Sequence, residues 1–539
     1  NIRVPKIIAI GTDEFDLFME SNKLWEIALN IRDNNKILSA FLKSELPKKQ
    51  TRVLKDIINN TKYPLAIRSS SLFEDSQYKP LAGIYSTFML PNSSKLEIDR
   101  LNQLIEAIKR VYASTFFQNP KSLLNKSDHR LEEEKMAIII MELAGKKHNE
   151  LFYPSLSGVA QSYNYYPVSY MKRNEGVVFT ALGLGKTIVD GEKSLRFSPK
   201  YPKILSQYYS IKSTINNSQN KFYALDMNKG KNPLKFGESK NLKKFNLDIA
   251  ELDGELANIA STITSDNLLR DSLKYSGTRV LTFANLIKYN RFPLTNLIKD
   301  IMILGEKAMG CPVEIEFAIN LHKNKSDEFC LLQMKPMVIG NKHEELNITN
   351  YKNKNISLCY SNQVLGNGEI NSVSHIVYVD PNKFNREKTK YIADEIGKVN
   401  NKLGIKNKYL LIGPGRWGTS DHWLGIPVNW EQINHARAII EIGIDELDPD
   451  PSFGSHFFQN ITNLRIGYFT IRKKYSKEHI DWDWLRKQNN YFESKYLKVV
   501  SLKEPLSIKI DGINGKGIVL KKKELNKAEP MNEEDSSGI

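Results

Sequence analysis

The chain has 539 residues, of which 41% are hydrophobic and 10% aromatic, and this composition is typical of a folded protein of several domains rather than a disordered chain. No run approaches the roughly 18 apolar residues of a membrane-spanning helix, and the first residues show no signal-peptide pattern, so we expect a cytoplasmic protein with no membrane partner. The net charge of +16 would suit a nucleic acid, but the Lys and Arg clusters are short and dispersed. Nucleic acid is therefore the weakest of three hypotheses, which the salt dependence of binding would test.

The N-terminal part combines predicted helices with one informative strand. Helical patterns cover residues 14–19 and 38–46, and the apolar strand 64–67 follows them. This strand delivers Arg68 to the start of a run of three serines, Ser69 to Ser71. Hydroxyl groups, backbone N–H groups and a guanidinium are suited to bind an anion, so we predict that this segment lines an anion site.

The next segments predict helices and a buried strand. The apolar residues of 96–118 recur every three or four positions, which indicates an amphipathic helix. Residues 137–141 form a branched apolar run that indicates a buried strand. Residues 205–250 are rich in Asn, Lys, Ser and Tyr and predict a loop or insertion, whereas 247–263 and 294–309 return to helical periodicity.

Two further strands, 310–319 and 329–336, carry regularly spaced polar side chains. Because side chains alternate between the faces of a strand, Glu314 and Glu316 share one face, and so do Gln333 and Lys335. The four side chains therefore have the geometry to face one cleft. Carboxylate and amide oxygens are ligands that Mg²⁺ prefers, and a cation beside them would neutralise phosphate. Each residue taken alone would more often be part of an ordinary surface ion pair.

A polar stretch at 340–355 separates this part from the remainder, and we place the domain boundary at residue 340. Residues 341–525 predict a second, smaller α/β domain of unknown role. Its predicted elements are strand 373–380, helix 386–403, strand 409–412, helix 430–441, strand 465–471 and a hairpin over 506–520 that turns at 511–515. Residues 526–539 are polar and acidic, which predicts a disordered tail.

Several motifs, in this order, resemble the N-terminal PEP/pyruvate-binding domain of phosphoenolpyruvate synthase and pyruvate phosphate dikinase. They are Tyr63-Pro-Leu-Ala-Ile-Arg-Ser-Ser-Ser-Leu-Phe-Glu-Asp-Ser76, Leu81-Ala-Gly-Ile-Tyr-Ser-Thr-Phe88, Ser157-Gly-Val-Ala160, Leu182-Gly-Leu-Gly-Lys-Thr-Ile-Val-Asp-Gly191, Gly310-Cys-Pro-Val-Glu-Ile-Glu-Phe-Ala-Ile319 and Phe329-Cys-Leu-Leu-Gln-Met-Lys-Pro336. The resemblance covers residues 1–340 and implies an ATP-grasp-like domain, so the expected fold class is α+β. It also implies a kinase-type or dikinase-type phosphotransferase that uses ATP and Mg²⁺.

The resemblance assigns roles to individual residues. The residues expected to bind the nucleotide are Arg68, Gly83, Thr87, Glu142, Gly183, Gly185, Lys186, Glu316, Gln333 and Lys335. Among these, Glu316 and Gln333 would hold the metal, Arg68 and Lys335 would act on the phosphates, and Glu142 would lie at the adenine hinge. Gly183, Gly185 and Lys186 would form a flexible loop over the phosphates, with an ordinary turn as the equal alternative.

The chain departs from the family pattern at three positions. Lys335 stands where the family usually has Arg, Met141 where it has Gln, and Lys186 where it has an acidic residue. Lysine gives up the two-pronged phosphate contact of arginine. The family's early Gly-Lys segment also lies before the first residue, so we expect either a chain truncated upstream or weak ATP binding. A catalytically impaired nucleotide-binding sensor or scaffold is therefore the alternative function.

The phosphoryl acceptor is not evident from the sequence. The family relays phosphate through a histidine, and the nearest match to that motif is Phe453-Gly-Ser-His456, although the residues that follow do not fit. A neutral histidine is a competent nucleophile, so His456 is a catalytic candidate, with a satisfied, partly buried histidine as the alternative.

One glycine-rich segment formally matches a dinucleotide fingerprint. Gly413-Pro-Gly-Arg-Trp-Gly418 follows a predicted strand, but Gly425 and Pro427 prevent the helix that such a site requires. We predict instead an anion-binding turn that uses Arg416 or, as the alternative, a structural aromatic corner.

Overall fold

The computed structural model describes most of the chain. The described residues are 1–74, 81–124, 130–167, 171–228, 241–337, 355–444, 447, 455–472 and 478–521. Spatial contacts divide the chain into two compact units, and the first comprises residues 1–339 together with 453–460. The second unit comprises residues 340–452 and 461–539. The predicted boundary at residue 340 and the predicted tail 526–539 lie outside the described residues.

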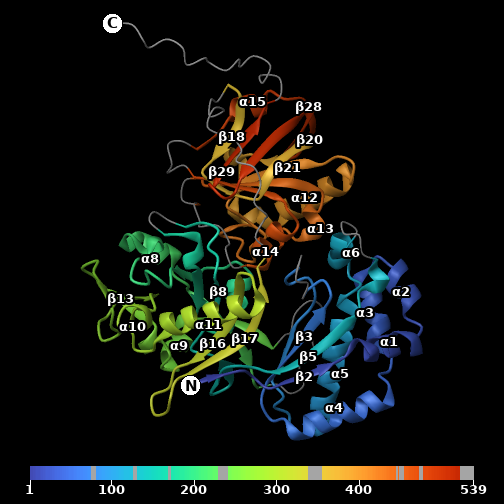
Figure 1. The fold of residues 1–539 in the computed structure, drawn as a ribbon, viewed down its shortest axis with the longest axis vertical. Coiled ribbons are helices and arrows are strands. Elements are labelled where there is room, and N and C mark those ends of the chain that lie inside the picture. Colours follow the sequence, from blue (N-terminus) through green and yellow to red (C-terminus); the bar gives the residue numbers. More distant parts are fainter. Residues whose placement is uncertain are drawn as a thin grey trace. The chain divides into compact units, whose positions relative to one another are not determined.

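The first unit begins with a four-stranded antiparallel sheet and its helices (Figure 1). In spatial order the strands are β2 (Ile7–Ile10), β5 (Met136–Glu142), β3 (Leu65–Ser71) and β4 (Phe88–Leu90). The helices are α1 (Thr12–Ser21), α2 (Trp25–Asn30), α3 (Asn34–Lys43), α4 (Lys48–Asn60), α5 (Glu97–Ser114) and α6 (Gln118–Leu124). The predicted amphipathic helix is α5, whose Leu104 and Ile108 are fully buried, and it packs on β3, β4 and β5.

The remainder of the first unit is built on a six-stranded sheet. In spatial order its strands are β1 (Ile2–Arg3), β17 (Glu328–Pro336), β16 (Val313–Asn320), β8 (Leu156–Gln161), β9 (Val177–Ala181) and β10 (Leu195–Phe197). Helix α11 (Leu294–Met309) packs on β16 and β8 and ends at Gly310, whose left-handed backbone closes the helix. Gly158 of β8 leaves room for the ring of Phe317, which a side chain at that position would displace.

The described part of the first unit also contains two small sheets and four short α-helices. The small sheets are β12 (Leu242–Asn246), β11 (Lys221–Asp226), β7 (Leu151–Tyr153) and β6 (Lys146–His148), and then β14 (Leu269–Arg270), β13 (Ala260–Ile263) and β15 (Thr278–Leu281). The short helices are α7 (Lys186–Val189), α8 (Ile211–Asn217), α9 (Leu247–Leu252) and α10 (Ala284–Ile287). Apolar side chains from both small sheets join the core of the six-stranded sheet.

The second unit contains a ten-stranded mixed sheet (Figure 1). Along the sheet the strands are β19 (Gln363–Leu365), β25 (Gly467–Ile471), β24 (Ala436–Ile442), β21 (Tyr409–Pro414), β20 (Asn367–Val379), β28 (Leu497–Asp511), β29 (Lys516–Leu520), β18 (Ser357–Ser361) and β26 (His479–Ile480), with β27 (Asn490–Glu493) paired to β28. The other strands and α-helices described for this unit are β22 (Arg416–Trp417), β23 (Gly425–Ile426), α12 (Thr389–Leu403), α13 (Trp430–Ile433) and α15 (Trp482–Arg486). Helix α14 (His456–Asn463) belongs to the first unit up to residue 460 and to the second unit from residue 461. Strands β20, β21, β24 and β25 are mutually parallel where they pair, and β21, β24, β25 and the last residues of β20 are largely buried, as expected of parallel strands.

Three sequence-based element predictions are wrong or incomplete. The predicted helix 430–441 is one helical turn, α13, followed by the buried strand β24, because a short branched apolar run fits a strand as well as a helix. The predicted loop 205–250 contains α8, β11 and β12, with 229–240 outside the described residues. The predicted helix 247–263 ends at Leu252, and strand β13 occupies its last residues.

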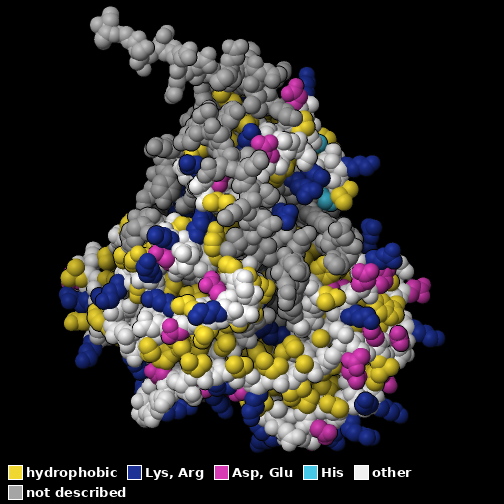
Figure 2. Space-filling view, in the orientation of Figure 1, with side chains coloured by type: hydrophobic (Ala, Val, Ile, Leu, Met, Phe, Trp, Pro, Cys, Tyr) yellow, Lys and Arg dark blue, Asp and Glu magenta, His cyan; other side chains and the backbone are white. Residues whose placement is uncertain are grey.

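The fold class is α+β, as predicted. Among the helices that the structure describes, none has the length and apolar character needed to cross a membrane. On the face shown in Figure 2, Lys and Arg side chains are scattered among Asp and Glu rather than gathered over one element.

Candidate functional site

Arg68 lies on β3, where the strand leaves the apolar core. Leu65, Ala66 and Ile67 are buried, and the strand continues through the serines to Ser71. The Arg68 guanidinium donates from Nη2 to Gln333 Oε1 at 2.7 Å, and Nη1 lies 3.6 Å from Glu316 Oε2. These contacts connect the four-stranded sheet to the six-stranded sheet within the first unit.

The serines that follow Arg68 have partners of their own. The hydroxyl of Ser69 donates to Glu74 Oε2 at 2.5 Å, and the hydroxyl of Ser71 accepts from the Glu74 backbone N–H at 3.3 Å. Both serines are buried. Their hydroxyls therefore stabilise the turn after β3, and the prediction that this segment lines an anion site stays a prediction.

Strands β16 and β17 bring the predicted polar side chains together. Their antiparallel register pairs Glu314 with Lys335 and Glu316 with Gln333. The Lys335 ammonium lies 3.3 Å from Glu314 Oε1 and 3.7 Å from Glu316 Oε1. Together with Arg68 these four residues form what we call the charged cluster.

Opposite charges in this cluster keep Glu316 and Lys335 ionised. Burial alone would raise the pKa of Glu316, but Arg68 and Lys335 outweigh that effect and hold its pKa below the ordinary value. Burial would likewise lower the pKa of Lys335, and the neighbouring Glu314 and Glu316 carboxylates outweigh it and raise that pKa. Glu316 and Lys335 are therefore both ionised at neutral pH.

A third element of the first unit comes from far along the chain. Residues 453–460 belong to this unit, and among them helix α14 begins at His456 with the Ser455 hydroxyl accepting the Phe458 N–H at 3.2 Å. His456 packs on Gly83 so closely that a methyl group added there would lie 2.2 Å from Nδ1. Burial, and then Lys335, lowers the pKa of His456 to about 3. The imidazole is thus neutral at physiological pH.

The next turn of α14 makes the contacts that sequence reasoning missed. Gln459 donates from Nε2 to Glu314 Oε1, and its Oε1 accepts from Lys335 Nζ at 3.5 Å. Asn460 donates to the Ala82 carbonyl and accepts from the Ala82 N–H, both at 2.8 Å. His456, Gln459 and Asn460 are spaced by three and four residues, so this helical periodicity was the signal available in the sequence.

The predicted phosphate loop is held in place rather than free. Gly183 has a left-handed backbone, its carbonyl accepts from Ser157 Oγ at 2.8 Å, and a side chain there would collide with the Tyr223 carbonyl. Gly185 precedes α7, whose first residue, Lys186, pairs with Asp190 at 2.7 Å. Lys186 is close enough to contribute to lowering the pKa of His456. These contacts favour the ordinary turn, and the role of the segment over the phosphates stays a prediction.

Two predicted residues lie apart from these contacts. Glu142, the last residue of β5, accepts from Arg3 at 3.1 Å. Its backbone N–H donates to the Lys6 carbonyl and that of Leu143 to the Pro64 carbonyl, each at 2.9 Å, so neither donor is left for an adenine ring. Thr87 is exposed immediately before β4. The roles of Glu142 and Thr87 stay predictions.

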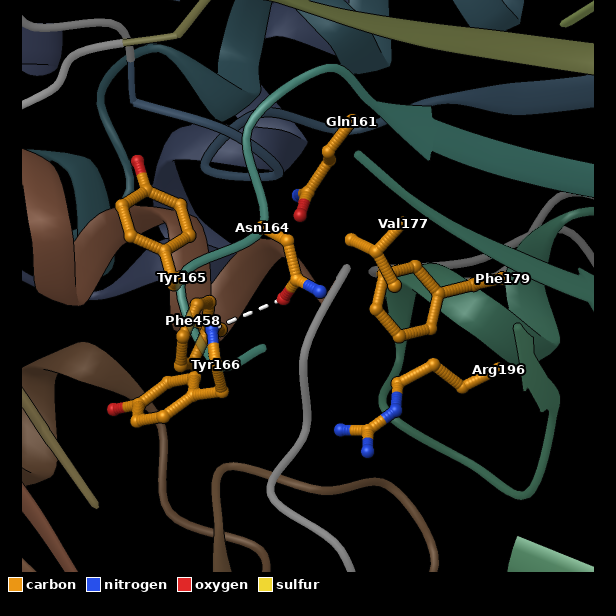
Figure 3. Close-up of a pocket in the computed structure, with 8 residues that line it drawn as sticks. All are labelled: Gln161, Asn164, Tyr165, Tyr166, Val177, Phe179, Arg196 and Phe458. Carbon is orange, nitrogen blue, oxygen red and sulfur yellow. Dashed lines mark hydrogen bonds between the residues drawn. The ribbon is translucent and has the colours of Figure 1, made fainter. Parts of the chain in front are cut away.

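A small recess lies beside Glu314 (Figure 3). It encloses about 190 Å³ including its open mouth, and Gln161, which lines it, donates from Nε2 to Glu314 Oε2 at 2.7 Å. The ring of Phe458 packs against Tyr165 and Tyr166 with centroid distances of 6.0 and 6.1 Å. In Figure 3 the Arg196 guanidinium lies across the recess from these rings. Gln161 therefore supports Glu314 from the wall of the recess, and the recess itself is too small for a nucleotide.

The cluster fits magnesium-ATP better than a metal alone. No group of three or more His, Cys, Asp or Glu side chains that could hold a metal is found in the described part of the chain. Mg²⁺ usually takes only one or two protein carboxylates and completes its shell with water and phosphate oxygens. The ionised Glu316 and the Gln333 amide oxygen, which accepts from Arg68, could provide such a partial shell, and Arg68 and Lys335 could provide cations for phosphate.

The glycine-rich segment of the second unit is a structural corner. Trp417 is completely buried, its backbone N–H donates to Glu441 Oε1 at 2.8 Å, and its indole N–H donates to the Ile440 carbonyl at 3.1 Å. Strands β22 and β23 pair at this point, and Arg416 is buried with only 8% of its surface exposed. These contacts favour the aromatic corner over the anion-binding turn.

The fold and the charged cluster define an ATP-grasp-like nucleotide-binding protein. More particularly, residues 1–355 match the family described as pyruvate phosphate dikinase, AMP/ATP-binding domain. This match covers more than half of the chain, which therefore belongs to that family. No curated protein matches the chain.

Proposed function

We propose that this protein is a magnesium-dependent ATP phosphotransferase of the dikinase type and that His456 accepts the phosphoryl group. One observation carries the proposal: a neutral histidine lies among Arg68, Glu316 and Lys335, the side chains suited to hold phosphates and metal. Phosphoryl transfer needs mainly positioning and neutralisation of charge, and this arrangement supplies both. Dependence on ATP favours a cytoplasmic location.

Each residue has a defined task in the proposed reaction. Glu316 and Gln333 hold Mg²⁺, which neutralises the phosphate oxygens. Arg68 and Lys335 bind those oxygens and orient the chain of phosphates. A lone pair of the neutral His456 imidazole attacks phosphorus, an N–P bond forms as the P–O bond to the leaving nucleotide breaks, and the nucleotide keeps the electron pair. The other imidazole nitrogen keeps its proton.

The test is phosphorus NMR of ATP with the protein and Mg²⁺, beside Glu316→Ala and His456→Gln variants. The expected result is an acid-labile phosphoenzyme, with either AMP or ADP released, that both variants lack. AMP would indicate transfer of a pyrophosphoryl group and ADP transfer of the terminal group. A phosphoenzyme that survives in His456→Gln would refute His456 as the acceptor.

A second candidate is a nucleotide-binding sensor or scaffold without turnover. The observation that favours it is that Lys335 already has Glu314, Glu316 and Gln459 as partners, so part of the phosphate site is internally satisfied. Unchanged ATP whose resonances broaden with the native protein and stay sharp with Glu316→Ala would support this candidate over the enzyme.

A further inference from the structure

Gln459 contacts two opposite charges of the cluster with a single amide group. Its Nε2 donates to Glu314 Oε1, and its Oε1 accepts from Lys335 Nζ at 3.5 Å. Glu314 is 3% exposed and Lys335 is largely buried, so these contacts are shielded from water. The contact with Glu314 is a charge-assisted hydrogen bond, one of the stronger kinds in proteins, whereas the contact with Lys335 is long and weaker.

The amide contacts two opposite charges with the complementary ends of its dipole. Its positively polarised N–H group lies on Glu314, beside the Glu316 carboxylate proposed to hold the cation, and its negatively polarised oxygen lies on Lys335, where a phosphate oxygen would bind. The Lys335 ammonium has three hydrogen-bond donors, and Glu314, Glu316 and Gln459 already surround it, so a phosphate oxygen needs the position that Gln459 takes. Resting on the proposed function, we propose that Gln459 is an internal competitor of magnesium-ATP, which must displace the Gln459 amide from Glu314 and Lys335 in order to bind.

The neighbouring contacts indicate how the amide is displaced. Asn460, the next residue, is 1% exposed and holds α14 on Ala82 through two hydrogen bonds that do not involve the cluster. Glu314 keeps its second oxygen on Gln161 at 2.7 Å. A rotation of the Gln459 side chain therefore frees Lys335 and one oxygen of Glu314, while the helix and His456 stay in place.

The experiment measures binding of magnesium with a non-hydrolysable ATP analogue by calorimetry, so that turnover does not contribute. Gln459→Leu keeps nearly the same volume and removes the amide, and Gln459→Asn keeps the amide but shortens its reach. Gln488→Leu is the matched control, since that glutamine of the second unit donates to the Trp484 carbonyl instead. Thermal unfolding without nucleotide checks that each variant is folded.

We expect both Gln459 variants to bind the analogue about tenfold more tightly than the native protein, the equivalent of one charge-assisted hydrogen bond, and Gln488→Leu to bind like the native protein. Native-like or weaker binding by the folded Gln459 variants would overturn the inference but leave the proposed function standing. Absence of binding in the native protein and in both Gln459 variants would remove the proposed function and the inference together. Amide hydrogen exchange of 456–460 that rises on binding would also overturn it, because the helix itself would then be released.

Discussion

The contact between Gly83 and His456 allows a direct test of the site. Gly83 has a φ of +66°, and an added methyl group would lie 2.2 Å from His456 Nδ1, 2.7 Å from Cγ and 3.0 Å from Cβ. Because Cβ is fixed to the backbone, a rotation of the imidazole cannot remove the whole clash. Gly83→Ala must therefore either strain this contact or push the start of α14 away from the charged cluster.

The loss of stability expected for Gly83→Ala has two parts, which a control variant separates. A left-handed backbone costs a residue with a Cβ about 1–2 kcal/mol, and overpacking a closed contact typically costs a further ~1–3 kcal/mol. Gly310 has nearly the same φ, +67°, with no atom near the added methyl group, so Gly310→Ala carries the backbone part alone. If α14 holds its position, Gly83→Ala should be the less stable of the two by the overpacking term.

The assays are urea unfolding and formation of the phosphoenzyme from ATP. If α14 moves away, the two glycine variants should unfold alike, but Gly83→Ala alone should lose the phosphoenzyme while it retains nucleotide binding. Either form of damage supports the contact. Equal stability of the two variants together with native phosphoenzyme formation in both would refute the packing of His456 on Gly83.

Three further predictions concern charge. Arg68→Lys removes the guanidinium that reaches both Gln333 and Glu316, and we expect calorimetry to show about tenfold weaker binding of magnesium-ATP, with unchanged affinity as the contrary result. Burial lowers the pKa of His456 to about 3, so below pH 6.5 the unfolded chain binds a proton that the folded chain does not bind. The free energy of unfolding should therefore fall as the pH drops from 6.5. In urea unfolding, His456→Gln should flatten that dependence on pH. Burial raises the pKa of Glu441 to about 7, so the contribution of this carboxyl group to stability is present below pH 4.5 and is lost as the pH rises through 7. The free energy of unfolding of Glu441→Gln should therefore rise relative to that of the native protein between pH 5 and 8. A difference between the two proteins that stays constant over this range would contradict the raised pKa.

Sequence patterns predicted those helices and strands whose periodicity and end residues lie within the element or next to it. The helix 294–309 was predicted to the residue, because its periodicity is regular and Pro293 and Gly310 mark its ends. The strand β24 was missed because Ala-Arg-Ala-Ile-Ile-Glu-Ile is compatible with either secondary structure until its neighbours β21 and β25 are known. The edge strand β12 was missed because its lysines face solvent, and a polar edge strand resembles a loop in sequence.

For the candidate site too, local sequence patterns predicted some residues and could not predict others. The alternation rule was sufficient to put Glu314 and Glu316 on one face of their strand and Gln333 and Lys335 on one face of theirs, because only local geometry was involved. The register that pairs Glu314 with Lys335 and Glu316 with Gln333 is known only from the structure. The contacts of Asn460 with Ala82 span 378 residues, and no local pattern determines which distant segment completes a cleft. The sequence therefore predicted the charged side chains and did not predict the helix that packs against them.

The charge of the site also could not be inferred from the charge of the chain. The protein carries a net charge of +16, yet within the cluster the two carboxylates of Glu314 and Glu316 balance Arg68 and Lys335, and burial keeps His456 neutral. A site of balanced charge does not attract a polyphosphate by its net field; it binds one only if the metal takes over a carboxylate and so releases a cation for phosphate. Magnesium then competes with Arg68 and Lys335 for Glu316, and phosphate competes with the Gln459 amide for Lys335, which is why occupancy of this site should depend on all three together.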